Sequence, residues 1–80
     1  MVEESQIRKD VREILARIQQ TDQLEIGDED DIFNLGLDSV RTILLITELE
    51  NKYSVALVKD EIPYDRIRTI SGIADWIANA

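Results

Sequence analysis

The sequence predicts a small all-α bundle of three main helices, with a short extra helix before the last one. Residues 3–20, 39–53 and 70–79 repeat apolar side chains at the helical period of about 3.6 residues. The one candidate strand, around residues 55–58, has no partner strand in the sequence, and a single short strand cannot form a sheet. The connections allow antiparallel helices. We expect the 80 residues to form a single domain over 1–80.

The first helix, expected over residues 3–20, has one apolar face. Its apolar residues stand at i, i+4, i+7, i+8 and i+11, which places them on one stripe: Ile7, Val11, Ile14, Leu15 and Ile18. Pairs of opposite charges four residues apart on the remaining surface stabilise the helix by only about 0.2–0.5 kcal/mol per pair. We therefore expect the stripe to pack in the core and not to form a binding site.

A long connection over residues 21–38 follows, and it is strongly acidic. Residues 21–40 contain seven acidic side chains and no basic one: Asp22, Glu25, Asp28, Glu29, Asp30, Asp31 and Asp38. A connection of this length is usually functional or contains its own short structure, and we expect Phe33 and Leu35 to anchor it. A calcium loop of EF-hand type starting at Asp28 is excluded, because Ile32 and Phe33 stand where a ligand and a glycine are needed.

The second helix, expected over residues 39–53, has more apolar side chains than one face can hold. One group is assigned to the core, together with Leu35: Leu45, Ile46, Leu49 and Tyr53. A second group falls on another face, near Glu48: Val40, Ile43, Leu44 and Thr47. A helix that is apolar around most of its circumference is either buried on all sides or has a second partner. The residues alone leave both possibilities open, and a partner-binding face is the preferred one.

The rest of the chain is expected to close the bundle. Residues 54–62 are predicted to form an irregular loop that covers the core. A short helix over roughly 60–67 is expected to include Pro63 and to bury Ile67. Thr69 is a good N-cap for a last helix over 70–79, in which Trp76 is expected to be a partly buried packing residue. The inward side of that helix is assigned to Ile70, Ile73, Ala74 and Ile77.

Composition excludes several functional classes. The chain has no cysteine, so it lacks a thiolate nucleophile and a zinc-type cysteine cluster, and it has no histidine, the commonest general base and metal ligand. An enzyme is therefore the least favoured class. The formal net charge of −8 argues against nucleic-acid binding and favours partners with basic surfaces. No apolar run approaches the length of a membrane span, and no signal-peptide core is present. We therefore expect a cytoplasmic protein that does not bind membranes.

One short stretch, Leu35–Val40, joins the acidic connection to the second helix. Gly36 permits the backbone angles that a turn into a helix often needs. Asp38 is a strong N-cap residue, and Ser39 then stands at or next to the first helical position with its hydroxyl expected in solvent. The free N–H groups and partial positive charge of a helix N-terminus suit an attached phosphate. Taken alone, Asp-Ser before a helix is also ordinary capping chemistry.

The wider stretch Asp31–Val40, in a small acidic chain and before an apolar-rich helix, resembles the carrier-protein family of acyl, aminoacyl and peptidyl carriers. The resemblance extends over roughly Ile7–Ile77. It implies that Ser39, in a Gly-x-Asp-Ser motif with Gly36 and Asp38, receives 4′-phosphopantetheine from coenzyme A through a phosphopantetheinyl transferase. It also implies a discrete, monomeric carrier without catalytic residues, which presents acyl thioesters in fatty-acid, polyketide or related biosynthesis.

In this family the second helix is the main recognition element for acyl-loading and acyl-processing enzymes with basic docking surfaces. The residues carried over to that role are Leu37, Val40, Arg41, Ile43, Leu44, Thr47 and Glu48. Arg41 departs from the acid that many acyl carriers have there. Leu37 stands where aminoacyl and peptidyl carriers often have glycine, which favours an acyl carrier. The alternatives are an aminoacyl or peptidyl carrier and, in another class, an unmodified acidic helical module that docks a basic partner.

Overall fold

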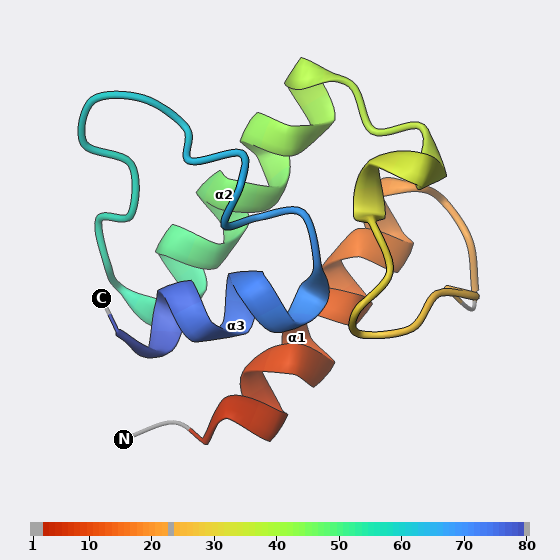
Figure 1. Ribbon diagram of the computed structural model, residues 1–80, viewed down its shortest axis with the longest axis horizontal. Coiled ribbons are helices and arrows are strands. Elements are labelled where there is room, and N and C mark those ends of the chain that lie inside the picture. The colour runs from red at the N-terminus through yellow and green to blue at the C-terminus, as the bar shows by residue number, and fades with distance from the viewer. Residues whose placement is uncertain (1–2, 23, 80) are drawn as a thin grey trace.

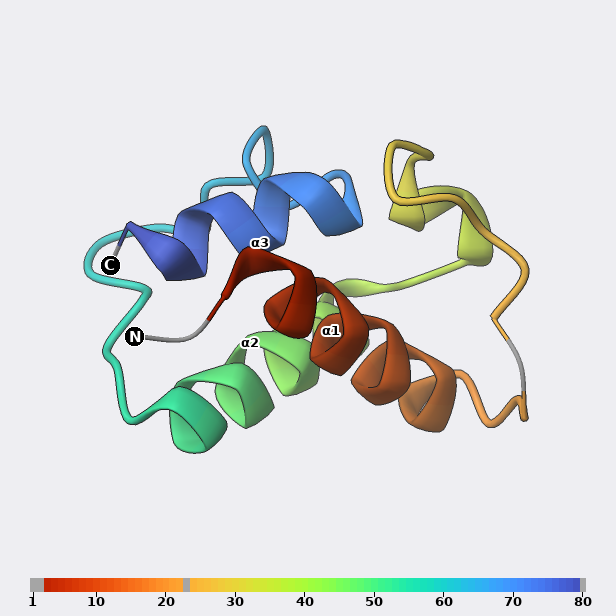
Figure 2. The same ribbon diagram turned by 90° about the horizontal axis from the view of Figure 1, so that it is seen from below.

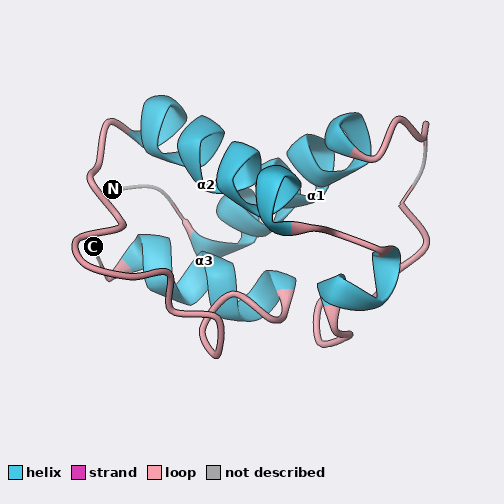
Figure 3. Cartoon of the chain, turned by 90° about the horizontal axis from the view of Figure 1, so that it is seen from above, coloured by secondary structure: helices cyan, strands magenta, loops and turns pink. Residues whose placement is uncertain are grey.

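The computed structural model describes residues 3–22 and 24–79, and the secondary structure in these residues is entirely helical (Figures 1 and 3). The elements are α1 (Glu4–Ile18), the 3-10 helix η1 (Ile32–Leu35), α2 (Ser39–Tyr53) and α3 (Ile70–Ala78). The predicted all-α class and its three main helices are confirmed. The bounds of α2 agree with the prediction, while α1 and α3 are slightly shorter than predicted.

Helix α1 packs against both of the other helices. Figure 2 shows α2 and α3 on two sides of α1, with the connection that contains η1 at the end of the molecule opposite the start of α1. The predicted apolar stripe of α1 is buried: Val11 and Leu15 have no exposed surface, and Ile7 is nearly as deep. Removal of this apolar surface from water is the main driving force for packing the helices together. Four of the five stripe residues therefore belong to the core, as expected, while Ile18 is partly buried and packs against it.

The other helices and the loops complete the same core. Leu45 and Leu49 on α2, Ile70 and Ile73 on α3, and Ile67 before α3 are all buried. Thr69 caps α3 as predicted, because its Oγ1 accepts a hydrogen bond from the Gly72 N–H at 2.9 Å.

The acidic connection is anchored mainly by Ile32, which is completely buried. Phe33 and Leu35, the two expected anchors, are partly buried and pack at the edge of the core. The Ile32 N–H donates to the Arg68 carbonyl at 2.7 Å, and the Ser71 N–H donates to the Asp28 carbonyl at 3.0 Å. These two bonds attach the connection to the segment that precedes α3 and to the start of α3.

The short helix predicted over residues 60–67 is not formed, and this part of the prediction is wrong. The Pro63 carbonyl accepts from the N–H groups of Arg66 and Ile67, which makes one turn that is not continued. A helix over 60–67 would need the Tyr64 N–H to donate to the carbonyl of residue 60, but that N–H donates to the Ile62 carbonyl at 2.9 Å. The extra helical turn lies instead at η1, on the other side of α2 in the sequence.

A polar contact that the sequence analysis did not predict joins α1 to the end of α2. The Asp10 carboxylate is 92 % buried, and it accepts hydrogen bonds from the Tyr53 hydroxyl and from the Gln6 side-chain amide at 3.0 Å. Burial, and then the hydrogen bond and negative charge of Asp10, raise the pKa of the Tyr53 hydroxyl well above its ordinary value of about 10. The folded protein therefore holds the Tyr53 proton more tightly than the unfolded chain does.

This contact predicts a loss of stability at alkaline pH. Because the folded-state pKa is the higher one, the contribution of Tyr53 is complete below about pH 10 and is lost as the pH rises from there toward the folded-state value. Chemical denaturation between pH 8 and pH 11 should show this alkaline loss in the wild type and a smaller one in Tyr53→Phe. At neutral pH we expect Tyr53→Phe to cost about 1 kcal/mol. Equal alkaline slopes for the two proteins would contradict the assignment.

Candidate functional site

The N-terminus of α2 is capped by Asp38, as the sequence predicts. The Asp38 Oδ1 atom accepts a hydrogen bond from the Arg41 N–H at 2.8 Å. The Asp38 carbonyl accepts from both the N–H (3.0 Å) and the hydroxyl (2.8 Å) of Thr42, whose side chain is buried. These bonds hold the first turn of the helix in a defined position.

Ser39 is the first residue of α2, and its side chain is exposed. Its hydroxyl makes no hydrogen bond to any described residue, and the N–H groups of Ser39 and Val40 have no acceptor there either. Unbonded N–H groups and the helix dipole make this position favourable for a negatively charged group. The site thus combines an accessible hydroxyl with donors that can stabilise an attached anion.

Gly36 ends η1 and turns the chain toward α2. Its φ of 85° lies in the left-handed region, and its N–H donates to the Phe33 carbonyl at 3.1 Å. A Cβ atom at this position would meet nothing within 4 Å, so the backbone angle and not a lack of space favours glycine. The contribution of Gly36 to the site is therefore to set the path of the chain that leads to Ser39.

Beside Ser39 lies an open hollow of about 330 Å³. Its lining comes from three segments: Phe33, Leu37, Asp38, Ser39, Thr42, Tyr64 and Arg68. The rings of Phe33 and Tyr64 are neighbours, with their centroids 6.0 Å apart and an angle of 51° between their planes. Tyr64 and Arg68 cannot be recognised as site residues from the sequence, because they follow α2 in the chain and no local motif connects them to Ser39.

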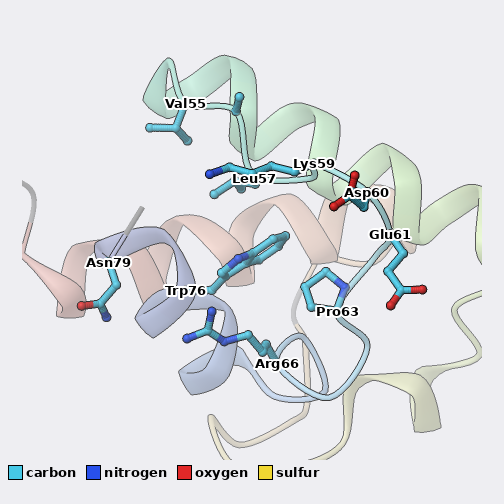
Figure 4. Close-up of a pocket in the computed structure, with 10 residues that line it drawn as sticks. Val55, Leu57, Lys59, Asp60, Glu61, Pro63, Arg66, Trp76 and Asn79 are labelled. Atoms are coloured by element: carbon cyan, nitrogen blue, oxygen red, sulfur yellow. The ribbon is translucent and has the colours of Figure 1, made fainter.

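A second, larger hollow of about 580 Å³ lies between residues 55–66 and α3, and Ser39 does not line it. Figure 4 shows Lys59 and Arg66 on opposite sides of the Trp76 ring. The Trp76 side chain is 92 % buried, so it is a packing residue of the core, as the sequence predicts. This hollow is therefore distinct from the one beside Ser39.

The outer side of α2 carries an exposed, largely apolar face, which we call the α2 face: Val40, Arg41, Ile43, Leu44 and Thr47. The exposed fractions of Val40, Ile43 and Leu44 are 65 %, 52 % and 49 %, so complete burial of the helix is excluded. Neighbouring Glu48 is half-buried and forms an ion pair with Arg17 at 2.8 Å.

Leu37 does not lie on an exposed surface, contrary to its assignment to the partner-binding set. Only 9 % of Leu37 is exposed, because it packs in the hydrophobic core and contributes to the wall of the hollow beside Ser39. Arg41 is exposed as expected, and its Nη1 donates to the Gln19 Oε1 at 3.0 Å. Gln19 in turn donates to the Leu35 carbonyl at 2.6 Å, which links the end of α1 to both sides of the Ser39 motif.

Part of the acidic connection is neutralised by arginines from elsewhere in the chain. Arg12 forms an ion pair with Asp28 at 2.6 Å, and Arg68 lies 3.8 Å from Asp31. No group of three or more acids, cysteines or histidines in the described residues is arranged to hold a metal ion. None of the helices in the described part of the chain has the length and hydrophobicity needed to cross a membrane.

The family comparison agrees with this geometry. The chain matches the family described as "Phosphopantetheine attachment site" over residues 9–77, which includes η1, α2, two thirds of α1 and all of α3 except Ala78. The comparison with curated proteins finds no match. Members of the matched family carry 4′-phosphopantetheine as a covalently attached group. Because the match extends over most of its length, the chain belongs to the family of phosphopantetheine-bearing carrier proteins.

Proposed function

We propose that Ser39 is the attachment residue and that the chain carries acyl groups as thioesters on the 4′-phosphopantetheine arm. The observation that carries this proposal is the exposed Ser39 hydroxyl at the start of α2, which, like two neighbouring N–H groups, has no hydrogen-bond partner among the described residues. The residues fit the group, because a phosphodiester on Ser39 would place its negative charge at the positive end of the helix dipole. The attached arm supplies a thiol, which this cysteine-free chain lacks.

Ser39 needs an external base for its own modification. The chain has no histidine, and the Ser39 hydroxyl has no carboxylate partner among the described residues, so this hydroxyl is not activated as a nucleophile. A phosphopantetheinyl transferase must therefore remove the Ser39 proton as the new O–P bond forms. The P–O bond of the coenzyme A pyrophosphate breaks in the same step, and 3′,5′-ADP is the leaving group. Asp38 and Gly36 act indirectly, by capping α2 and by setting the turn before it.

The test is incubation with coenzyme A, Mg²⁺ and a broad-specificity transferase, followed by intact-mass and peptide mass spectrometry. We expect the mass to increase by one phosphopantetheinyl group, located on the peptide that contains Ser39. A folded chain that stays unmodified with several transferases would favour the alternative class, an acidic interaction module. Subsequent loading by acyl-transferring or by aminoacyl-activating enzymes would distinguish an acyl carrier from an aminoacyl or peptidyl carrier.

We further propose that the α2 face binds the partner enzymes of a monomeric carrier, with the whole chain acting as one domain. Three large apolar side chains are exposed together there, and Asp38 and other exposed acids precede them in the sequence. An exposed apolar face and a strongly acidic preceding segment fit enzymes that have basic docking surfaces, and the charges would mainly speed their association.

Leu44→Glu tests this face. Because Leu44 is about half exposed, the substitution should change the free energy of unfolding by about 0.5 kcal/mol or less, while it strongly slows cargo loading or transfer. Denaturation curves and loading rates measure the two effects. Asn51→Glu is the matched control, since it adds the same charge at an exposed position near the other end of α2. A loss of several kcal/mol, or equal loading rates for both variants, would contradict the assignment.

A further inference from the structure

The fold brings one basic side chain to the hollow beside Ser39. Residues 21–40 contain no base, and Arg68 is the sole basic residue in the lining of that hollow. Its backbone is held in place, because the Arg68 carbonyl accepts from the Ile32 N–H at 2.7 Å. Its side chain is 60 % exposed, and its Nη1 lies 3.8 Å from the Asp31 Oδ2, which is beyond hydrogen-bonding distance. The guanidinium therefore keeps donors available for another anion.

Another part of the lining of this hollow is aromatic and apolar. Phe33 and Tyr64 form an edge of paired rings, and Tyr64 remains 47 % exposed. The Tyr64 hydroxyl has no hydrogen-bond partner among the described residues. Buried Leu37 adds a further apolar wall. The hollow thus offers a cation, a hydroxyl and apolar surface together, with Ser39 in its lining.

These features match the parts of a phosphopantetheine arm. A phosphodiester carries one negative charge, for which a guanidinium is a good partner, and the arm continues with two methyl groups and two amides. We infer that this hollow is a docking site for the protein's own arm, in which Arg68 pairs with the phosphodiester and the Phe33–Tyr64 pair contacts the methyl-bearing part. The inference rests on the proposed attachment at Ser39.

Docking of this kind is reversible and depends on charge. The Arg68 side chain is well exposed, so salt screens its attraction to the phosphodiester. The arm therefore exchanges between a position in the hollow and a free position in which a partner enzyme can take its thiol. Arg68 is a positioning residue for the arm and takes no part in bond formation.

The experiment is NMR spectroscopy of the loaded protein at low salt, after intact mass has confirmed one arm on Ser39. We expect nuclear Overhauser contacts between the arm methyl protons and the ring protons of Tyr64 and Phe33, and a shift of the Arg68 Nε–H signal on loading. Arg68→Gln should weaken the methyl-to-ring contacts at least twofold, and about 0.5 M salt should weaken them in the wild type. Tyr64→Ala should remove the contacts to that ring without preventing attachment.

Arg66→Gln is the matched control. Arg66 is an exposed arginine two residues before Arg68, and it lines the hollow beside Trp76 instead of the one beside Ser39. This substitution should leave the methyl-to-ring contacts unchanged. A loaded wild type without these contacts, or equal losses in Arg66→Gln and Arg68→Gln, would overturn the docking inference and leave the proposed function standing. A chain that takes no arm on Ser39 would overturn both.

Discussion

Ser39→Ala should abolish attachment of the arm and leave the fold unchanged. The Ser39 hydroxyl is exposed and makes no hydrogen bond to the described residues, so its removal should change the free energy of unfolding by about 0.5 kcal/mol or less. The Asp38 cap uses the Arg41 N–H and is retained in the variant. Intact mass after transferase treatment should show one added group in the wild type and none in the variant, with similar thermal melting curves for both.

Ser5→Ala is the matched control for this prediction. Ser5 is also an exposed serine in the first turn of a helix, and α1 lacks a side-chain cap at its N-terminus. The Ser5→Ala protein should therefore be modified as fully as the wild type. Modification of Ser39→Ala, or an added group on the peptide that contains Ser5, would show that Ser39 is not the attachment residue.

Gly72→Ala should cause the largest loss of stability among the substitutions considered. A Cβ atom on Gly72 would stand 2.3 Å from the Arg66 carbonyl oxygen and 3.1 Å from the Thr69 Oγ1 that caps α3. Because the nearer atom belongs to the backbone, the turn before α3 must move. Overpacking costs about 1–3 kcal/mol, and we take the upper end of that range because a backbone atom cannot move aside as the end of a flexible side chain can. Alanine gains roughly 1 kcal/mol over glycine inside a helix, which offsets part of this cost. We expect a net destabilisation of about 2 kcal/mol in denaturation experiments.

The control for Gly72→Ala is Gly27→Ala. A Cβ atom on Gly27 would meet only the Asp30 side chain, at 3.2 Å, and this side chain can rotate away. Gly27→Ala should therefore stay within about 0.5 kcal/mol of the wild type. If the two variants are equally stable, the close approach of α3 to the Arg66 carbonyl does not constrain residue 72.

The sequence by itself determined the three main helices and the candidate attachment motif. The apolar period of α1, the two groups of apolar residues on α2 and the Thr69 cap of α3 are local patterns, and the structure reproduces each of them. The Asp38 cap and the position of Ser39 at the start of α2 are local in the same sense. Such features depend on neighbours within about one helical turn, and these can be read directly from the chain.

Only the tertiary structure decided what surrounds Ser39. Arg68 lines the hollow from a segment that its own carbonyl attaches to the Ile32 N–H across the molecule, and Tyr64 belongs to the turn just before it. In that turn the Tyr64 N–H bonds to the Ile62 carbonyl, so the helix that local signals predict over residues 60–67 does not form. The burial of Leu37 and the contact of Tyr53 with Asp10 likewise depend on how segments that are distant in sequence pack together. Local periodicity contains no information about such contacts, because they are set by the closure of the loops around the core.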